Sequence, residues 1–301
     1  MLRQLSFGIL CILASLLVLL NYHITRQINN TENTIKQNYI KNWQIENRIK
    51  DESDVKIEPK SQILKFYETL NKSEAKNFSQ NGEDGVIQEI LKLTNRNYGG
   101  NYVEIGAGDG FESNTRNLRI NFDWSGVAFD YNNKNLKLNV KMKKITHMNI
   151  LQIFQEQRID REIDLLSIDT DFSDYWILEK ILEFYKPKYV IHEINQQPPD
   201  QCVTVAKLNG LAFWDNHSKY FGASLCAYYC LAIRFEYTMV YCESKGVNCF
   251  WIRNDILENK FKNIDAETIQ KELNPNLLYR KVKEEYKEFS RRTWIELNKC
   301  F

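Results

Sequence analysis

Two acidic residues that stand one position apart, Asp169 and Asp171, follow an apolar run and are the first candidates for chemistry in this chain. In one interpretation they form a D-x-D clamp, with which glycosyltransferases hold a divalent metal and a nucleotide sugar. In the other they are the acidic end of an inner strand in a different kind of transferase. Because the two interpretations require different cofactors, the surrounding residues have to decide between them.

A glycine-rich segment, VEIGAGDG (103–110), is the second candidate site. Glycines such as Gly106 and Gly108 permit positive φ and let a ligand approach the backbone closely, and a helix that begins behind them favours an anionic ligand group. The spacing is one residue shorter than the G-x-G-x-x-G of dinucleotide-binding folds, however, and Asp109 would repel a pyrophosphate. Asp109, with Glu104 on the preceding strand, instead tolerates a cationic sulfonium ligand.

Two polar residues follow the next expected strands. Asp130 ends the strand at 125–130, where an acid can hold both hydroxyls of a ribose; the alternative is an acid in a solvated turn. Asn149 lies at the end of the strand expected at 144–150, where a side-chain amide can meet the edge of an adenine. Together they predict ligand contacts at the ends of these strands.

Strand-like and helix-like segments alternate from residue 76 onward and must position these residues. Apolar strands separated by helices predict a parallel sheet covered on both faces, and a short SKG turn (244–246) predicts that the last two strands are antiparallel. This is the layout of the class I methyltransferase fold, a Rossmann-like α/β mixed sheet with a terminal antiparallel hairpin. Strands are expected at 101–106, 125–130, 144–150, 163–169, 187–195, 237–243 and 247–254, and helices at 79–93, 113–120, 133–142, 175–185 and 222–235.

Seven short segments in a fixed order resemble a known family. They are SQNGEDG (79–85), VEIGAGDG (103–110), SNT (113–115), WSGVAFD (124–130), IDLLSIDTD (163–171), PKYVIHEIN (187–195) and GASL (222–225). Their order and spacing over roughly residues 76–255 resemble the FkbM-type methyltransferase-like domain, in a form found in invertebrate animals. The resemblance implies a Rossmann-like fold and S-adenosylmethionine as the cofactor. Where the family more often has a glycine after the acidic strand end, this chain has Phe172.

The resemblance also implies which residues contact the cofactor. The positions at which the superfamily binds it correspond here to Glu104, Gly106, Gly108, Asp130 and Asn149. Asp109 inside the glycine loop and Asp169 at the end of a neighbouring strand complete the set of expected cofactor-binding residues.

The carboxyl ends of parallel strands share one rim of the sheet, so Asp169, Asp171 and Glu193 are expected beside the glycine loop. Methyl transfer to a hydroxyl needs alignment and a group that takes the proton. Asp171 is the first choice for that base, with Glu193 and His192 as further catalytic candidates. His192 alternates with Glu193 along a buried strand, which favours a core position for the imidazole. Alternatively, Asp169, Asp171 and Glu193 hold a divalent cation, and all-oxygen ligation suits Mg²⁺ or Mn²⁺.

The first 24 residues are expected to form a cytosolic stub and a signal-anchor transmembrane helix. The segment LSFGILCILASLLVLL (5–20) contains no charge, and no small-residue cleavage pattern follows it, which favours an uncleaved anchor over a cleaved signal peptide. A polar stem is expected at 25–75, the methyltransferase-like domain at 76–258 and a charged helical tail at 259–301. We therefore expect the chain to be a single-pass type II membrane protein of the Golgi or endoplasmic reticulum, with its domain in the lumen.

Cysteines and sequons also favour a lumenal domain. Six cysteines follow the expected anchor, an even number that suits disulfides in an oxidising compartment; buried free thiols are the alternative. Four N-x-[ST] sequons begin at Asn29, Asn71, Asn77 and Asn216. The net charge of +1 provides no electrostatic reason for a nucleic-acid partner. The expected acceptor in such a compartment is a hydroxyl of a glycan or glycoprotein.

Three functions therefore compete. The favoured one is an S-adenosylmethionine-dependent O-methyltransferase of the secretory pathway. A Golgi glycosyltransferase using Asp169 and Asp171 is the first alternative, although such a domain has no need of a glycine loop at its first strand. The second is a domain that keeps the fold but serves as a binding or trafficking partner without catalysis.

Overall fold

The computed structural model describes residues 58–300 except 216, 263 and 281–292. Within these ranges no helix is long and apolar enough to cross a membrane. The anchor expected at 1–24, and the expected stem as far as residue 57, lie outside the described residues.

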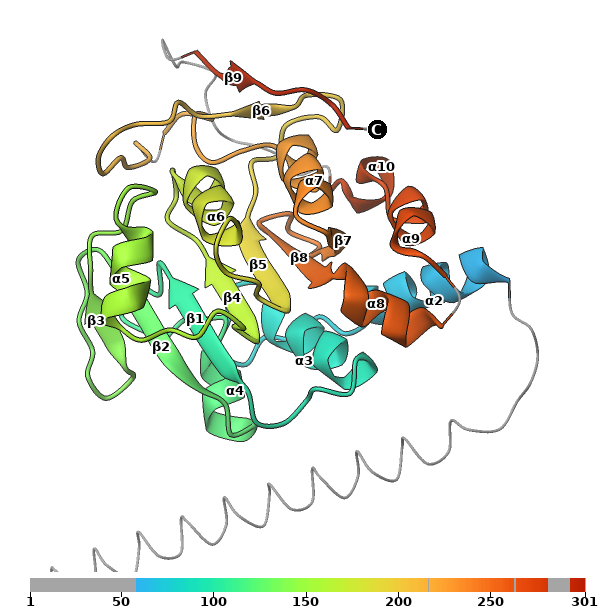
Figure 1. Ribbon diagram of the computed structural model, residues 1–301, viewed down its shortest axis with the longest axis horizontal. Coiled ribbons are helices and arrows are strands. Elements are labelled where there is room, and N and C mark those ends of the chain that lie inside the picture. Colours follow the sequence, from blue (N-terminus) through green and yellow to red (C-terminus); the bar gives the residue numbers. More distant parts are fainter. Residues whose placement is uncertain (1–57, 216, 263, 281–292, 301) are drawn as a thin grey trace, which may run out of the picture. The chain divides into compact units, whose positions relative to one another are not determined.

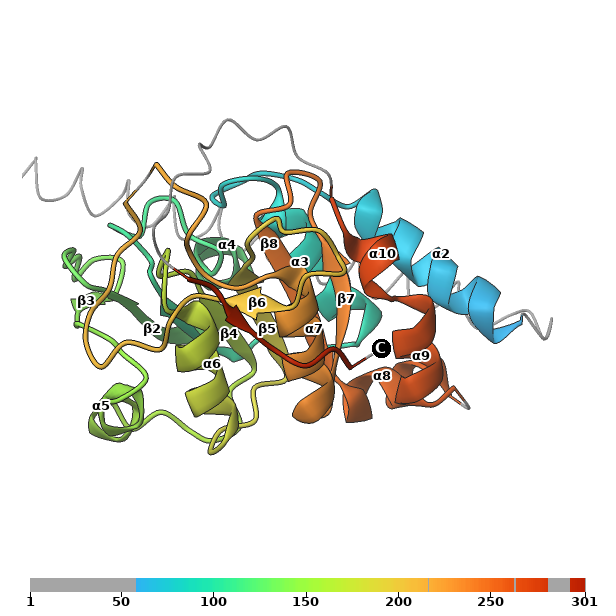
Figure 2. The ribbon, with the colours of Figure 1, turned by 90° about the horizontal axis from the view of Figure 1, so that it is seen from above.

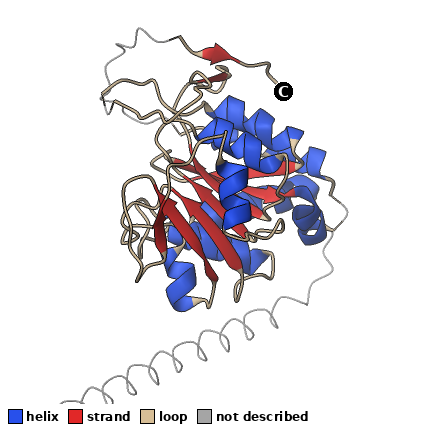
Figure 3. Ribbon diagram, turned by 60° about the vertical axis from the view of Figure 1, so that its left-hand side comes forward, coloured by secondary structure: helices blue, strands red, loops and turns tan. Residues whose placement is uncertain are grey.

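A seven-stranded mixed sheet forms the centre of the structure (Figure 1). Its spatial order is β3-β2-β1-β4-β5-β8-β7, in which the first five strands are parallel and β8 runs antiparallel to both β5 and β7. This arrangement confirms the predicted parallel sheet with a terminal hairpin and fits the class I methyltransferase fold. The strands are β1 (Asn101–Ile105), β2 (Ser125–Asp130), β3 (Val140–Met142), β4 (Leu165–Ile168), β5 (Tyr189–Glu193), β7 (Tyr237–Cys242) and β8 (Asn248–Arg253). A two-stranded sheet of β6 (Val203–Thr204) and β9 (Ile295–Glu296) lies apart from it (Figure 3).

Helices cover both faces of this sheet (Figure 2). Helices α3 and α4 lie on one face and α5, α6 and α7 on the other, as crossovers between parallel strands require. Four further helices, α2, α8, α9 and α10, gather at the β7–β8 edge. The helices are α2 (Pro59–Asn71), α3 (Glu83–Leu93), α4 (Arg116–Asn121), α5 (Ile150–Glu156), α6 (Asp174–Leu182), α7 (Leu225–Arg234), α8 (Asn254–Phe261), α9 (Ala266–Glu272) and α10 (Pro275–Leu278).

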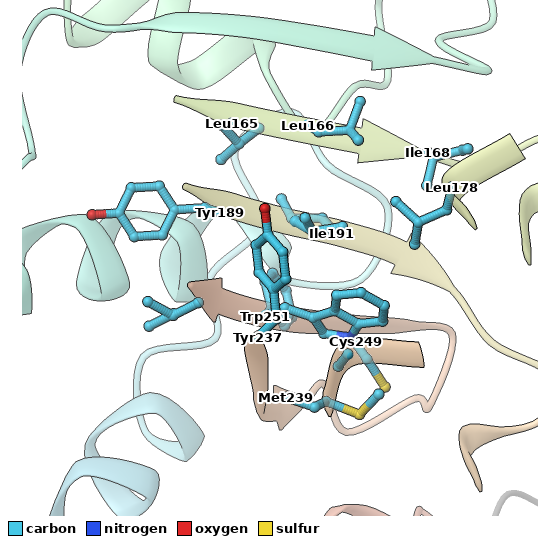
Figure 4. Close-up of a cluster of buried hydrophobic side chains, with 14 of the residues drawn as sticks. Leu165, Leu166, Ile168, Leu178, Tyr189, Ile191, Tyr237, Met239, Cys249 and Trp251 are labelled. Atoms are coloured by element: carbon cyan, nitrogen blue, oxygen red, sulfur yellow. The ribbon is translucent and has the colours of Figure 1, made fainter. Parts of the chain in front are cut away.

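The inner strands are apolar along their whole length because both of their faces are covered. Every residue of β4 and the first four residues of β5 are buried. Burying a Leu or Ile side chain contributes about 1.5–3 kcal/mol, so this layer supplies much of the stability that holds the strand ends in place. Figure 4 shows part of it, with Leu165, Leu166, Ile168, Leu178, Tyr189, Ile191, Tyr237, Met239, Cys249 and Trp251 labelled.

The folded unit extends further toward the amino terminus than the boundary expected at residue 76. Helix α2 buries Ile63, Phe66 and Leu70, and it packs against α3, α9 and β7. The spacing of these residues forms one apolar stripe in a lysine-rich and glutamate-rich segment. The last part of the expected stem, at 59–71, is therefore a core helix.

The tail expected at 259–301 also belongs to the fold in its described part. Ile269, Leu273 and Leu278 are completely buried beside α7 and β7. The chain forms short helices here because Asn274, whose side chain caps α10, and Pro275 separate α9 from α10. Up to Leu278 the described part of the tail is therefore helical, as predicted, but it consists of separate short helices that pack at the β7 edge of the sheet.

The third strand lies at 140–142, and neither the strand expected at 144–150 nor the helix expected at 133–142 forms. Asn135 and Val140 exchange two backbone hydrogen bonds of 3.0 and 2.8 Å, and Asn139 has a φ of 56°, which asparagine tolerates. Leu138 and Val140 pack against Ala107 and Ala128, so the apolar residues of this segment follow the period of a strand.

The six cysteines that follow residue 24 form three disulfides, as their even number suggested. The pairs, which the sequence left open, are Cys202–Cys226, Cys230–Cys300 and Cys242–Cys249. Cys242 and Cys249 are register partners across the β7–β8 hairpin, and the Cys230–Cys300 bond links α7 to the segment that follows β9.

Candidate functional site

The carboxyl ends of β1, β2 and β4 surround a cavity of about 430 Å³. This volume is within the range of small-molecule sites, and the position is where parallel α/β sheets bind ligands. The cavity is lined by the glycine loop, through Gly106 and Gly108, and by Asp130, Asp169 and Asp171. Two of the segments that the sequence singled out therefore meet in one cavity.

Gly106 occupies a position that no other residue fits. Its φ is 87°, and a Cβ added to it would lie 1.5 Å from the main-chain oxygen of Asp169. The Gly106 N–H donates to the Phe129 oxygen at 2.8 Å, and the Asp169 N–H donates to the Ile105 oxygen at 2.9 Å, which ties the ends of three strands together. By contrast, a Cβ added to Gly108 would meet nothing within 4 Å. The loop is therefore closed against β4 at Gly106 and open at Gly108.

Asp130 joins the glycine loop to the turn after β2. Its Oδ2 accepts from the Gly108 N–H at 3.1 Å, and its Oδ1 accepts from the N–H groups of Asn132 and Asn133 at 2.9 and 2.6 Å and from Asn133 Nδ2 at 2.9 Å. A carboxylate oxygen has about two acceptor sites, so Oδ2 retains capacity for a ligand hydroxyl. The contact with a ribose hydroxyl expected for Asp130 stays a prediction.

Glu104 lines the cavity but directs its carboxylate toward the protein. Oε2 accepts from Ser113 Oγ at 2.6 Å and Thr115 Oγ1 at 2.5 Å, and Oε1 accepts from the Asn114 N–H at 2.9 Å. Burial raises the pKa of Glu104, and these hydrogen bonds oppose the rise. Since Asn114 Nδ2 in turn donates to Ser167 Oγ on β4 at 3.1 Å, Glu104 holds the turn before α4 against the sheet.

The SQNGEDG segment folds beneath the cavity. Asp84 Oδ2 accepts from the N–H groups of residues 77, 78 and 79 at 2.6–2.9 Å, and Ser79 Oγ accepts from the Asp84 N–H at 3.0 Å. Glu83 Oε1 accepts from Asn248 Nδ2 at 2.8 Å. Gln80 and Asn248 line the cavity, and Glu83 and Asp84 are buried anchors that shape it.

Four carboxylates gather where β4, β5 and α6 meet. Oxygens of Asp169, Asp171 and Glu193 lie within 4.8 Å of one another. Asp174, which is fully buried, accepts the Thr170 N–H at 2.6 Å through Oδ1 and so lies against the same turn. Asp174 was not among the residues that the sequence predicted for this site, although its spacing after Asp169 and Asp171 was an available signal. Among the described residues, none of these four acids forms an ion pair with lysine or arginine.

Burial raises the pKa of every member of this acidic group, and nearby carboxylates add to the rise. For Asp169 and Glu193, burial is the larger cause and the neighbouring carboxylates the smaller, and both pKa values are raised well above the ordinary value. Burial raises the pKa of Asp174 to about 6. Asp171 is exposed as a residue, but partial burial of its carboxylate and the charge of Asp130 raise its pKa as well.

His192 lies in the core, as its alternation with Glu193 indicated, and does not line the cavity. Its ring packs against Tyr228 and Trp251, with centroid distances of 4.0 and 4.9 Å. Burial lowers the pKa of His192 to about 3, so the imidazole is neutral at physiological pH. The structure therefore contradicts a catalytic role for His192, because its ring lies in the core and not in the cavity.

Asn149 is also outside the cavity, contrary to the expected adenine contact. Its Oδ1 accepts from the Thr146 N–H at 2.8 Å and its Nδ2 donates to the Lys144 oxygen at 2.8 Å, so the side chain closes the turn before α5. The error follows from the misplaced third strand, because Lys143 and Ile145 are the residues that line the cavity after β3. Asp109 lines the cavity rim and is exposed.

The segment at 205–222, apart from residue 216, lines one side of the cavity through Leu211, Ala212 and Phe213. Phe213 lines it and contacts Tyr131, with ring centroids 4.8 Å apart. Phe172, which follows Asp171, is buried against Val205 and Tyr220. Phe172 thus anchors this segment and does not fill the cavity. The sequence provided no sign of the Tyr131 and Phe213 pair, which are far apart along the chain.

Comparisons with known proteins add little to this geometry. No family model and no curated protein match the chain. Solved structures with some similarity include the CurJ carbon methyltransferase, at 12% identity and a TM-score of 0.30 over 65% of this chain and 60% of that one. Another is phosphoethanolamine N-methyltransferase 1 of Haemonchus contortus in complex with phosphoethanolamine and S-adenosylhomocysteine, at 11% identity and a TM-score of 0.30 over 68% and 53% of the two chains. The chain thus spans 60% and 53% of these two proteins, and similarity this low carries no argument about its activity.

Proposed function

We propose that this chain is an S-adenosylmethionine-dependent methyltransferase of the FkbM type, and that its acceptor is a hydroxyl group of a glycan or glycoprotein in the lumen of the secretory pathway. The observation that carries the proposal is the arrangement of Gly106, Gly108 and Asp130 around the cavity. When bound, the cofactor would supply the electrophilic methyl group.

The residues around the cavity fit this cofactor. The open backbone at Gly108 leaves room for a ligand, and Asp130 Oδ2 can accept a hydrogen bond from a ribose hydroxyl. Asp109, Asp169 and Asp171 line the same cavity and make it acidic. Such a charge attracts a sulfonium cation and repels the pyrophosphate of a dinucleotide.

The proposed location rests on observations outside the cavity. Three disulfides suit an oxidising compartment. Asn71 and Asn77, which begin two of the sequons, are exposed and can accept a glycan. A glycan or glycoprotein hydroxyl is the acceptor class that such a compartment offers in abundance.

A second candidate function is favoured by the acidic group alone. Asp169 and Asp171 could serve a glycosyltransferase that binds a nucleotide sugar through a metal. Their carboxylates, however, share the cavity with a glycine loop and Asp130, which such a site does not need. A fold retained without catalysis would bind S-adenosylmethionine weakly or without turnover.

Ligand binding to the purified full-length chain separates these functions. Calorimetry with S-adenosylhomocysteine is expected to show one saturable site, which Asp130→Ala abolishes. Asp160→Asn is the matched control, because Asp160 is an exposed acid that precedes the amino end of β4, whereas the cavity lies at the carboxyl ends of the strands. Binding of UDP-sugar with Mn²⁺, and none of S-adenosylhomocysteine, would contradict the proposal. Transfer of labelled methyl groups to a lumenal glycoprotein pool, lost after enzymatic deglycosylation, tests the acceptor.

A further inference from the structure

The carboxylates at the ends of β4 and β5 lack the partners that buried acids normally have. Asp174 is 0% exposed, and its Oδ2 has no hydrogen-bond partner among the described residues. Glu193 Oε2 is buried and equally without a partner there. A buried charge without a hydrogen bond or counter-charge is costly, so these oxygens need a positive or donating group.

The protein does not supply that group from its own described side chains. The imidazole of His192, next to Glu193 in the chain, directs Nδ1 toward the main-chain oxygen of Glu193 at 3.1 Å and is packed among aromatic rings. Lys143, a cation that lines the cavity, forms an ion pair with Glu156 at 3.1 Å. Among the described residues, no lysine or arginine forms an ion pair with the acidic group.

We propose that Asp169, Asp171 and Glu193 bind one divalent cation, with Asp174 supporting the site from the first turn of α6. Their oxygens lie within 4.8 Å of one another. Oxygen ligands at about 2.0–2.6 Å from one ion are separated by at most about 4–5 Å, so one ion can contact all three. The ligands are all oxygens, which suits Mg²⁺, Mn²⁺ or Ca²⁺ and disfavours softer metals.

The unpartnered oxygen of Asp174 is independent evidence for this ion. Asp174 Oδ1 is held by the N–H of Thr170, the residue between Asp169 and Asp171, and the carboxylate is thereby fixed against the turn that carries two of the ligands. An acid that only began α6 would not need complete burial. With a cation present, its second oxygen is satisfied through the ion or a water bound to it.

The role of the cation rests on the proposed methyl transfer. Asp169 and Asp171 line the cavity, so an ion between them can take an acceptor hydroxyl as a further ligand. The coordinated hydroxyl loses its proton to solvent more readily. The oxygen then forms a bond to the methyl carbon while the carbon–sulfur bond breaks and its electron pair returns to sulfur. The products are a methyl ether, S-adenosylhomocysteine and a proton.

Manganese binding to the full-length chain tests the site without reference to turnover. Electron paramagnetic resonance of free Mn²⁺ is expected to show one saturable site per chain, with competition by Mg²⁺ or Ca²⁺. Glu193→Gln and Asp169→Asn should weaken the affinity at least tenfold, whereas Asp200→Asn, which changes an exposed acid, should leave it unchanged. Thermal unfolding and far-UV circular dichroism of the same variants show that they are folded.

The outcomes separate this inference from the proposed function. Absence of saturable Mn²⁺ binding by the wild-type chain at millimolar concentration overturns the cation site even if S-adenosylhomocysteine binds. Saturable binding that is equal in Glu193→Gln, Asp169→Asn and wild type overturns it as well. Mn²⁺ binding that the variants lose, in a chain that does not bind S-adenosylhomocysteine, keeps the cation site and removes the methyltransferase proposal.

Discussion

The α-carbon of Gly106 faces the main-chain oxygen of Asp169, so closely that a Cβ on Gly106 would lie 1.5 Å from that oxygen. This contact joins the glycine loop after β1 to the acidic turn after β4. Ligand binding on the loop and the orientation of the acidic group are therefore coupled through backbone atoms.

Replacement of Gly106 by alanine is expected to disrupt this junction. The clash with Asp169 and the positive φ together cost about 3 kcal/mol or more, and S-adenosylhomocysteine affinity should fall at least tenfold. Thermal unfolding and calorimetry measure the two effects. Gly99→Ala is the matched control, because Gly99 also has a positive φ of 65° but open space around its Cβ. Equal behaviour of the two variants would show that the contact has no importance for binding.

Amide substitutions should distinguish Asp130, which supports the glycine loop, from Glu104, which supports the turn before α4. All hydrogen-bond partners of Asp130 are N–H donors. In Asp130→Asn the side-chain NH₂ group, itself a donor, would face some of these donors. The substitution should therefore weaken S-adenosylhomocysteine binding by about 10- to 100-fold. Two of the partners of Glu104 are hydroxyls, which can accept as well as donate. Glu104→Gln should therefore keep its affinity within about threefold. Titration calorimetry of both variants decides, and the reverse order of effects would contradict this account.

Because the His192 side chain is buried, we expect it to be protected from chemical modification in the native chain. Its side chain is 0% exposed, whereas His217 is exposed. Diethyl pyrocarbonate should label His217 in the native chain and His192 only after unfolding. Peptide mass spectrometry measures both rates in one sample. Native labelling of His192 at a rate near that of His217 would place the imidazole at the surface and restore it as a catalytic candidate.

Acid is expected to remove the stability that Asp164 contributes. Burial opposes its ionisation, but hydrogen bonds from Lys188 at 2.6 Å and the Asn101 N–H at 2.9 Å, with the charges of Lys188 and Arg96, lower its pKa below 3.8. A lowered folded-state pKa gives stability that is present above the unfolded-state value and lost as the pH falls through the folded-state value.

Asp164→Asn should therefore lower the free energy of unfolding by about 2 kcal/mol at neutral pH, and by progressively less as the pH falls below about 4 and through the lowered folded-state pKa. Urea unfolding of wild type and variant across this pH range measures the difference. Asp160→Asn, at an exposed position, is the control and should show no such trend. A constant difference between Asp164→Asn and wild type at all pH values would exclude the ion pairs as its source.

The sequence by itself determined the sheet and the place of its site. The strand segments at 163–169 and 187–195 are mostly apolar at their centres, and such strands are stable only where both faces of the sheet are covered. The glycines at 106 and 108 indicate a loop that needs positive φ. Parallel strands bring their carboxyl ends to one rim, which is why Asp130, Asp169 and Asp171 were predicted to meet at one site.

Only the tertiary structure decided which polar side chains face the cavity. Asn149 closes a local turn because the third strand begins nearer to Asp130 than the apolar pattern suggested, and local hydrogen bonds of asparagines outweighed helix periodicity there. His192 and Glu193 are neighbours in sequence, yet alternation along β5 sends one ring into the core and one carboxylate to the acidic group. The inclusion of Asp174 in that group, and the contact of Tyr131 with Phe213, depend on how α6 and the 205–222 segment pack onto the sheet, which residue spacing alone does not encode.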